Sequence, residues 1–234
     1  MKKLVLLGGI RYLLPLLATA RRNGIYTITV DNIPNNIAHR FSDEYWNISI
    51  IEKDLILRRC IDVSIDGITS FGVDPGVLTA AYVAEKMGLS GVPFKSAQIL
   101  QNKSLFRRFL LENNFNVPRV TTVGPDCEIK NVIGEIEYPV IVKPVDSAGS
   151  KGVSLVNNID ELTLAVDGAR LLSRANSVIV EEYIEVKEFQ SDSDFFSIDN
   201  KLVFSSYSNQ YFDKFSVNPY VPCGFTWPSS LSSV

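Results

Sequence analysis

The 234-residue sequence contains very little histidine and cysteine. His39 is the only histidine, which excludes a metal site with several histidine ligands and argues against a histidine-based catalytic triad. The three cysteines, Cys60, Cys127 and Cys223, have no CxxC spacing and form no disulfide framework. Such a set is typical of a reducing compartment, and we expect the protein to be cytoplasmic.

The sequence also lacks a basic excess and long apolar runs. Lys and Arg total 23 against 26 Asp and Glu, and no basic stripe predicts a nucleic-acid surface. No uninterrupted apolar run approaches the roughly 20 residues that span a bilayer. With 46% hydrophobic residues, the chain has the composition of a globular protein with one large or two modest domains. Any catalysis must therefore depend on carboxylates, lysines and backbone amides.

The first 22 residues, MKKLVLLGGIRYLLPLLATARR, have two interpretations. A basic tip, an apolar stretch and the triplet Ala18–Ala20 are similar to a secretory signal peptide. Arg11, however, interrupts the apolar run early, and the β-branched run Tyr26–Val30 comes next. A strand, a Gly-Gly turn, a helix and a second strand form the pattern of a βαβ unit, which we favour.

Residues 1–95 alternate between predicted strands and helices. Strands are predicted at Leu4–Leu7, Tyr26–Val30, Glu44–Ser49 and Gly67–Phe71, and helices at Tyr12–Asn23, Lys53–Asp62 and Pro75–Met87. Helices between strands predict a parallel sheet covered on both faces. The segment Leu89–Pro93 is the expected domain boundary.

The pattern changes in residues 96–234. One long helix is predicted over Ser96–Asn114 and another over Ile159–Arg174. Strands are predicted at Arg119–Val123, Val140–Pro144, Val153–Val156 and Ser177–Ile184, and a hairpin from Val203–Tyr207 and Tyr211–Phe215.

Three segments of this second half carry residues suited to binding a nucleotide. DSAGSKG (Asp146–Gly152) joins two predicted strands, and its small residues let backbone N–H groups approach an anion. A flexible hairpin with a surface lysine is the alternative.

Lys143 lies in an apolar strand, where it is costly to bury unless it meets an anion or a carboxylate. The alternative is that its side chain extends to solvent. The segment Val178–Phe189 leaves a strand in a way that can offer a C=O and an N–H to an adenine edge, with Glu188 for a ribose. Its alternative is an acidic strand end on the surface.

Taken in order, NKSLFRRFLLENNFNVPR (Asn102–Arg119), YPVIVKPVDSAGSKGV (Tyr138–Val153) and VIVEEYIEVKEF (Val178–Phe189) resemble the ATP-grasp superfamily. SFGVDPGVLTAAYVAEKMGLSGVP (Ser70–Pro93) is similar to the pre-ATP-grasp domain of its carbamoyl-phosphate-synthase-like, carboxylate–amine ligase branch. The resemblance covers essentially the whole chain and implies an α/β fold. It comprises an N-terminal parallel-sheet pre-ATP-grasp (Rossmann-like) domain at residues 1–95 and an incomplete α+β ATP-grasp domain at residues 96–234.

The resemblance implies a ligase that uses ATP and Mg²⁺ to phosphorylate a carboxylate, giving an acylphosphate that an amine or a thiol attacks. Two lysines would contact the ATP phosphates, a small-residue loop would cover them, and a hinge and an acid would hold the adenine and the ribose. These implied ATP-binding residues are Lys103, Lys143, Ser147, Gly149, Ser150, Lys151, Gly152, Glu181, Glu182, Tyr183, Ile184 and Glu188. The partners would be small-molecule carboxylate and amine substrates, with a homodimer left open, and no nucleic acid or membrane.

The chain departs from the family pattern in two places. Val186-Lys187 stands where the family often has a glycine before the ribose acid. The family's magnesium-binding acids and its E-x-N-type segment come after the region that corresponds to residue 234. We therefore expect a fragment without metal ligands of its own and without ligase turnover. Asp192 and Asp194 are expected to be loop acids.

The carboxyl edge of the N-terminal sheet is expected to border the acceptor substrate, because ligands of open α/β sheets bind there. Gly8 and Gly9 come directly after the first strand, and Asp31 and Asp74 lie in loops at the same edge. A loop-capping role for Asp31 is the alternative, and His39 is expected to be a loop residue.

Two alternatives to the ligase come from other functional classes. A non-catalytic nucleotide- or metabolite-binding protein would keep the fold without the metal half. An NAD-dependent oxidoreductase is disfavoured, because Leu7–Arg11 lacks the GxGxxG spacing and the loop with Lys151 would have no role.

Overall fold

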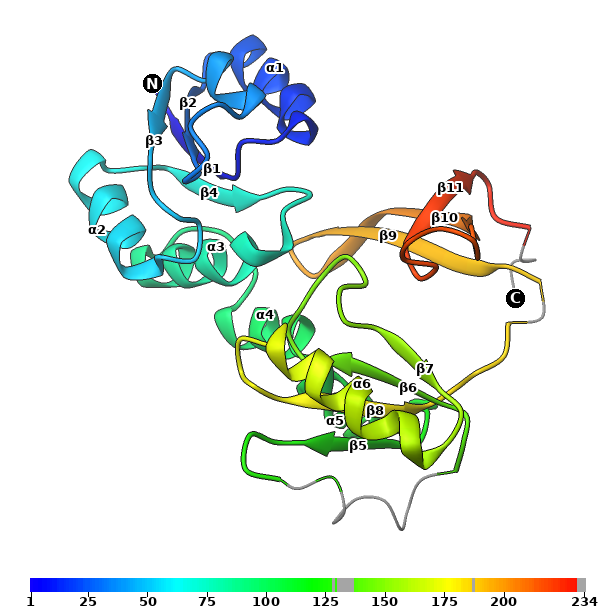
Figure 1. The fold of residues 1–234 in the computed structure, drawn as a ribbon. Helices are drawn as coiled ribbons and strands as arrows, with labels where there is room; N and C mark the ends of the chain where they lie inside the picture. Colours follow the sequence, from blue (N-terminus) through cyan, green and yellow to red (C-terminus); the bar gives the residue numbers. More distant parts are fainter. Residues whose placement is uncertain (128, 130–136, 187, 231–234) are drawn as a thin grey trace. The chain divides into compact units, whose positions relative to one another are not determined.

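Two compact units, Met1–Phe115 and Asn116–Val234, make up the chain in a computed structural model (Figure 1). The structure describes residues 1–127, 129, 137–186 and 188–230. The first unit includes the two helices after residue 93, whereas the sequence predicted a domain boundary at residues 95/96. That functional boundary stays a prediction.

The first unit is built on a parallel sheet with strand order β3-β2-β1-β4. Its strands are β1 (Lys3–Leu7), β2 (Tyr26–Val30), β3 (Glu44–Trp46) and β4 (Gly67–Ser70), close to the predicted positions. The connecting helices are η1 (Arg11–Leu13), α1 (Leu14–Arg22), η2 (Ile37–Arg40), α2 (Lys53–Val63) and α3 (Asp74–Met87). Every strand of this sheet runs in the same direction, as the alternation of helices and strands predicts.

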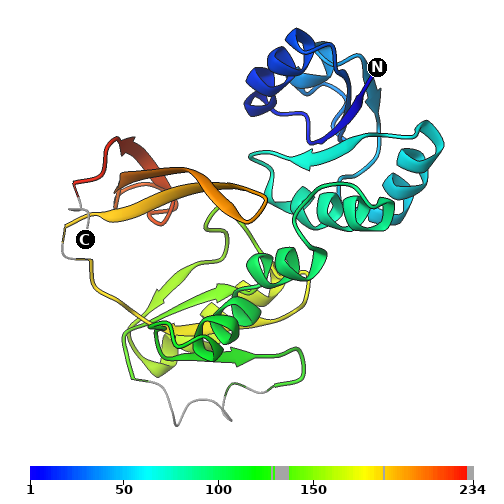
Figure 2. The same cartoon turned by 180° about the vertical axis from the view of Figure 1, so that it is seen from behind.

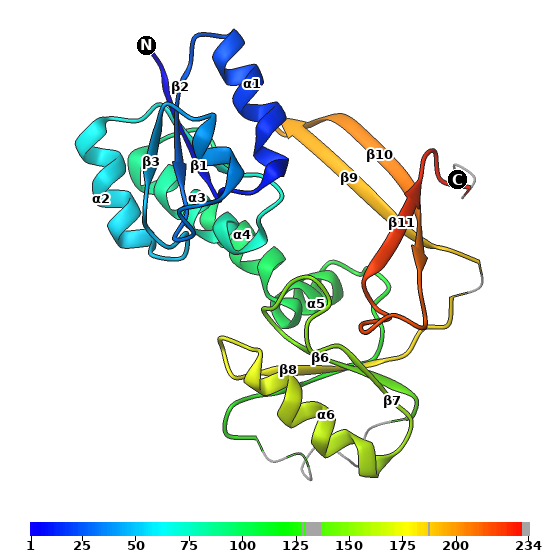
Figure 3. The ribbon, with the colours of Figure 1, turned by 45° about the horizontal axis from the view of Figure 1, so that its top comes forward.

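Both faces of this parallel sheet are covered by helices. Leu6 points to one face and packs with Leu13 and Leu17 of η1 and α1. Val5 and Leu7 point to the other face, in a core cluster that also holds residues of α2 and α3. Figure 3 shows α1 on one side of the sheet and α2 and α3 on the other. Strand β1 lies between β2 and β4 in this sheet, which fits the βαβ interpretation of the first 30 residues.

The predicted long helix over Ser96–Asn114 is wrong in one respect, because it consists of two helices. They are α4 (Phe94–Gln101) and α5 (Lys103–Glu112), separated by Asn102. Asn102 has an extended backbone (φ −119°, ψ 112°), and its side-chain oxygen accepts the N–H groups of Ser104 and Leu105 at 3.0 and 3.1 Å. It thus caps α5, a role for which asparagine is strongly preferred.

The second unit contains an antiparallel four-stranded sheet with order β5-β8-β6-β7. The strands are β5 (Val120–Val123), β6 (Val140–Pro144), β7 (Ser154–Val156) and β8 (Val178–Glu182). Helix α6 (Ile159–Leu171) packs on one face of this sheet, in front of it in Figure 1 and behind it in Figure 2. The core between them contains Val140, Val142, Val178 and Val180 from the sheet and Leu162 and Val166 from α6.

A second sheet comes next along the chain, with order β11-β10-β9, formed by β9 (Gln190–Ile198), β10 (Lys201–Phe212) and β11 (Pro222–Thr226). The predicted hairpin between Val203–Tyr207 and Tyr211–Phe215 is wrong, because β10 continues through Ser208 and Asn209. Both residues are buried and pair with β9, and Asn209 also pairs with β11, so the polar residues lie inside the ladder.

Asp192 and Asp194, expected in a loop, lie instead in β9. Asp192 pairs with Ser208 and Asp194 with Ser206 of β10. Alternating polar residues are compatible with a strand whose face is open to water. In the described part of the chain, no helix is long and apolar enough to cross a membrane.

Candidate functional site

Lys143 and Glu181 form an ion pair within the four-stranded sheet. Their strands pair in antiparallel register with Ile141 opposite Glu181, so Lys143 is the diagonal neighbour of Glu181. Lys143 Nζ lies 2.5 Å from Glu181 Oε2, and the two side chains are only 18% and 5% exposed. Because side chains alternate along a strand, both point away from the face that α6 covers.

This pair decides between the two alternatives for Lys143. The side chain meets a carboxylate inside the protein and does not extend to solvent. A buried charge left alone costs several kcal/mol, so each partner makes the burial of the other tolerable. The pair also brings together two residues that were predicted separately, one for the phosphates and one for the adenine hinge.

The loop Asp146–Gly152 comes directly after β6 and is fixed at its start by Asp146. The Asp146 carboxylate accepts hydrogen bonds from Ser173 Oγ at 2.8 Å and from the backbone N–H groups of Arg174 and Ala175 at 3.2 and 2.9 Å. The Ser147 hydroxyl donates to the carbonyl oxygen of Leu172. The start of the loop is therefore held against the segment that comes after α6.

The middle of this loop has an unusual backbone. Gly149, Ser150 and Gly152 all have positive φ angles, of 67°, 54° and 70°. A Cβ on Gly152 would lie 3.0 Å from side-chain carbons of Leu172 and Pro144, so both the space and the backbone angle favour glycine there. Lys151 is exposed. Since the hydroxyls of both serines already donate to carbonyl oxygens, backbone N–H groups and Lys151 are what this loop can offer an anion.

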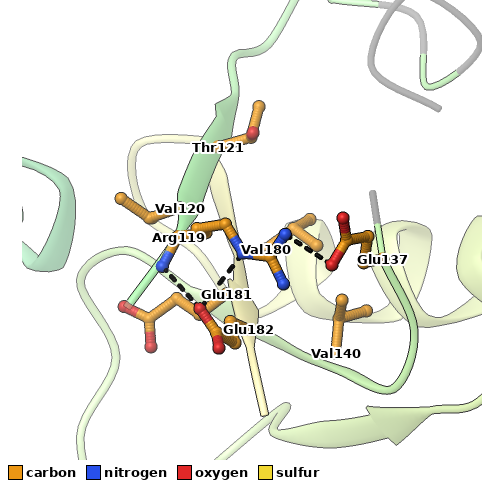
Figure 4. Close-up of a pocket in the computed structure, with 8 residues that line it drawn as sticks. All are labelled: Arg119, Val120, Thr121, Glu137, Val140, Val180, Glu181 and Glu182. Atoms are coloured by element: carbon orange, nitrogen blue, oxygen red, sulfur yellow. Dashed lines mark hydrogen bonds and ion pairs between the residues drawn. The ribbon is translucent and has the colours of Figure 1, made fainter. Parts of the chain in front are cut away.

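Glu182 ends β8 and is held by Arg119 (Figure 4). The backbone N–H of Arg119 and its Nε donate to Glu182 Oε2 at 3.1 and 3.3 Å, and Arg119 Nη1 lies 2.5 Å from Glu137 Oε2. The hydrogen bond from the Arg119 N–H is the largest cause that lowers the pKa of Glu182, and the guanidinium comes second.

The same contacts alter the ladder between β5 and β8. Glu182 N–H donates to the Arg119 carbonyl at 2.9 Å, and a regular antiparallel pair would return a bond from the Arg119 N–H to the Glu182 carbonyl. That N–H donates to the Glu182 side chain instead. The main-chain oxygen of Glu182 is thereby left without its usual ladder partner, and it can accept a bond from a ligand.

The remaining residues of the predicted adenine hinge come after β8 in the chain. Tyr183 N–H donates to the Pro139 carbonyl at 3.2 Å, and the Ile184 side chain is exposed. Glu188 is also exposed. Lys103 is the first residue of α5 and belongs to the first unit, whereas the other implied ATP-binding residues belong to the second unit.

A small pocket lies next to the end of β8 (Figure 4). Eight residues line it: Arg119, Val120, Thr121, Glu137, Val140, Val180, Glu181 and Glu182. Val140 and Val180 also pack with α6, so this pocket includes residues from the opposite face to Lys143. The sequence reasoning gave no role to Arg119 or Glu137, because their relation to Glu182 depends on strand pairing between distant segments.

In the first unit, Gly8 and Gly9 lie in a closely packed turn at the end of β1. A Cβ on Gly8 (φ 108°) would lie 2.8 Å from Val73 Cγ2, and one on Gly9 would lie 2.5 Å from His39 Nε2. Glycine is therefore required at both positions for packing. Asp74 is exposed at the first residue of α3. A substrate-binding role for Gly8, Gly9, Asp31 and Asp74 stays a prediction.

Asp31 and His39 stabilise the loop after β2. The Asp31 carboxylate accepts the N–H of Ile33 at 3.0 Å and Asn36 Nδ2 at 2.9 Å, which is the loop-capping role named as its alternative. His39 Nδ1 lies 2.8 Å from Thr29 Oγ1, and Nε2 lies 3.2 Å from the Ile33 carbonyl. Burial is the main cause that lowers the pKa of His39. His39 lies in the short helix η2 with partners at both ring nitrogens, so its expected position in a loop is wrong.

A family model described as "D-ala D-ala ligase C-terminus" matches residues 117–192. This range contains the Lys143–Glu181 pair, the loop Asp146–Gly152 and the hinge residues. Over these residues the chain is similar to the C-terminal, ATP-grasp domain of D-ala D-ala ligases.

Curated relatives are similar to this chain in sequence, and a solved structure is similar to it in fold. Formate-dependent phosphoribosylglycinamide formyltransferase of Prochlorococcus marinus is 27% identical over 187 residues, which are 78% of this chain and 48% of the relative. The carbamoyl phosphate synthase large chain of Caldanaerobacter subterraneus is 24% identical over 176 residues, 74% of this chain and 16% of the relative. N5-carboxyaminoimidazole synthetase from Staphylococcus aureus, solved as a complex with ADP, superposes with a TM-score of 0.77 at 17% identity, covering 98% of this chain and 59% of that chain.

The chain spans about half the length of the formyltransferases that it matches, at 48% of the relative. The order of a parallel-sheet unit and an antiparallel unit agrees with the fold class predicted from the sequence.

Proposed function

We propose that the protein is, or is the ATP-binding part of, an ATP-dependent carboxylate–amine (or thiol) ligase. The Lys143–Glu181 pair supports this most directly, because it keeps an ammonium group inside the protein at the end of β6, three residues before the glycine-rich loop. A phosphate group arriving there could replace Glu181 as the anion that Lys143 contacts. Backbone N–H groups of Gly149 and Gly152 and the Lys151 ammonium would supplement it.

In the proposed reaction, the γ-phosphoryl group of ATP passes to a carboxylate oxygen and ADP leaves. The amine or thiol then attacks the acyl carbon of the acylphosphate, loses a proton, and releases inorganic phosphate. The role of this chain is to bind and orient the nucleotide, since positioning and electrostatic stabilisation provide most of the catalysis in phosphoryl transfer. Which carboxylate and which amine react is set by residues outside this nucleotide site, and a homodimer stays a prediction.

Magnesium is implied by the ATP-grasp resemblance, and the described residues give no cluster of side chains to which it can be assigned. In the described ranges, no three histidine, cysteine, aspartate or glutamate side chains lie close enough together to hold a metal ion. We therefore assign no metal ligand and derive no step through the metal.

Titration calorimetry of ATP into the 234-residue chain, with and without Mg²⁺, tests the proposal. We expect binding that Lys143→Ala weakens by about ten- to a hundredfold, the equivalent of one hydrogen bond to a charged group. Unchanged affinity in Lys143→Ala would rule out its role at the phosphates. The 234-residue chain alone should form no acylphosphate; if it binds ATP and a longer form of the protein still shows no ligase turnover, the non-catalytic binding protein becomes the better description.

A further inference from the structure

The loop between β10 and β11 contacts the glycine-rich loop, which lies about 70 positions earlier in the sequence. Asn218 Nδ2 donates to the Ser150 carbonyl at 3.0 Å, and Ser150 Oγ donates to the Tyr220 carbonyl at 2.7 Å. The Leu155 N–H donates to the Tyr220 hydroxyl at 3.0 Å. These three bonds join the segment Asn218–Tyr220 to both the loop and the strand after it. All of these residues belong to the second unit.

The segment Asn218–Tyr220 is itself held in shape for these contacts. Asn218 Oδ1 accepts the N–H of Tyr220 at 3.1 Å, and Asn218, Tyr220, Ser150 and Leu155 are all half-buried. Asn218 therefore uses both ends of its amide, one to order its own turn and the other to contact Ser150. Tyr220 likewise contributes its carbonyl to Ser150 and its hydroxyl to β7, which is an edge strand.

Ser150 is the residue of the loop that most needs outside support. Its φ of 54° lies in the left-handed region, which a residue with a side chain adopts at an energetic cost. Such conformations persist when the surrounding structure holds them, and they concentrate at ligand clamps. Here the hydroxyl and the carbonyl of Ser150 are both bonded to the Asn218–Tyr220 segment, so this segment fixes the Ser150 side chain and the peptide group that follows it.

We propose that Asn218 and Tyr220 are positioning residues, which hold the loop Ser147–Gly152 in the shape that contacts nucleotide phosphates. The inference rests on the proposed function. It goes beyond that function because it places the control of the phosphate loop in the loop between β10 and β11, in side chains that do not touch the nucleotide. Loosening the segment leaves the adenine hinge intact, because Glu182 ends β8 and its partner Arg119 comes directly before β5, and neither contacts the segment.

The experiment compares ADP with adenosine as probes, using calorimetry on the full 234-residue chain. The variants are Asn218→Ala, Tyr220→Phe and the double variant. Tyr207→Phe is the matched control, since it also removes a tyrosine hydroxyl but on an exposed part of β10. We expect the double variant to bind ADP about tenfold more weakly, the equivalent of one or two lost hydrogen bonds, and to bind adenosine like the wild type. Tyr207→Phe should change neither affinity.

Each other result has a distinct meaning. If the wild type binds ADP and the double variant binds it equally well, the positioning role is wrong although the proposed function stands. If the affinities of the double variant for ADP and for adenosine fall to the same extent, the segment stabilises the whole unit and does not act on the phosphates. The single variant Tyr220→Phe removes only one hydroxyl, and it repeats this comparison with a smaller change to the fold. If the wild type binds neither probe, the proposed function itself fails.

Discussion

Replacing Glu181 by glutamine removes the negative charge that the buried ammonium group of Lys143 contacts at 2.5 Å. Glutamine has nearly the same size and keeps an oxygen that can accept a hydrogen bond. The change therefore tests the charge and not the packing. We expect the free energy of unfolding to fall and the affinity for nucleotide to rise, and few other substitutions would change the two in opposite directions.

The stability effect can be estimated from the burial of the two side chains. Removing one partner of a buried pair costs about 3–5 kcal/mol, because the other charge remains buried alone. Lys143 keeps 18% of its side chain exposed, so its ammonium can move part of the way to water, and the lower end of that range applies. A loss of about 3 kcal/mol corresponds to a melting temperature roughly 6–12 °C lower in a chain of 150–250 residues.

Nucleotide binding should change in the other direction. A phosphate group next to Lys143 restores the missing negative charge, so binding recovers part of the lost free energy. If it recovers half of about 3 kcal/mol, ATP binds about tenfold more tightly to Glu181→Gln than to the wild type. Lys143→Met should lose similar stability but bind ATP more weakly, and Lys143→Met combined with Glu181→Gln should regain stability without regaining affinity.

Urea unfolding and ATP calorimetry on these four proteins complete a double-mutant cycle. A stability of Glu181→Gln within about 0.5 kcal/mol of the wild type would show that the ion pair contributes nothing measurable to folding. An ATP affinity that falls in Glu181→Gln as much as in Lys143→Met would mean that Glu181 contacts the nucleotide itself. In either case the exchange of a carboxylate for a phosphate at Lys143 would be refuted.

Two further predictions concern residues outside this pair. The folded-state pKa of His39 lies below its ordinary value of 6.5, so the unfolded chain binds more protons between the two values and stability falls as the pH drops through about 6.5. In urea unfolding between about pH 5 and 7.5, the free energy of unfolding should therefore depend less steeply on pH in His39→Asn than in the wild type. Equal pH dependence in the two proteins would contradict this, since His39 is the only histidine. In Glu182→Ala the Arg119 N–H should instead donate to the main-chain carbonyl of residue 182, and adenosine should bind several-fold more weakly, by about 1 kcal/mol. Glu182→Gln keeps a side-chain acceptor and should keep the affinity for adenosine. Equal adenosine affinities of Glu182→Ala and the wild type in calorimetry would show that this carbonyl does not bind the adenine.

The sequence was sufficient to place elements whose pattern is local. β6 begins and ends at the predicted residues, because an apolar run that stops at Lys143-Pro144 defines it without reference to other segments. The break at Asn102 was missed because apolar spacing continues through it, although an asparagine before a helical run is itself a capping signal. Ser208 and Asn209 were taken for a turn, because burial of polar residues by two neighbouring strands leaves no trace in local composition.

The contacts within the candidate site could not be predicted from the sequence. Lys143 stood out as a cation in an apolar strand, and the choice between an anion and a carboxylate partner could be stated but not made. The partner Glu181 is opposite Ile141 only because of the register between β6 and β8, which the sequence does not display. The same reason hid Arg119 and Glu137, whose relation to Glu182 arises from the pairing of β5 with β8.

The glycine-rich loop shows how far such a long-range constraint can reach. Its composition indicated flexibility as well as anion binding, and glycine alone would allow many conformations. What selects one conformation is a set of groups far away in the sequence: Asp146 bonded to the segment after α6, and Ser150 bonded to Asn218 and Tyr220. A loop that binds phosphates through its backbone needs this restraint, because every N–H ordered in advance lowers the entropy lost on binding. The glycines therefore supply the permitted backbone angles, and the contacts from the segment after α6 and from the loop between β10 and β11 decide which of them are used.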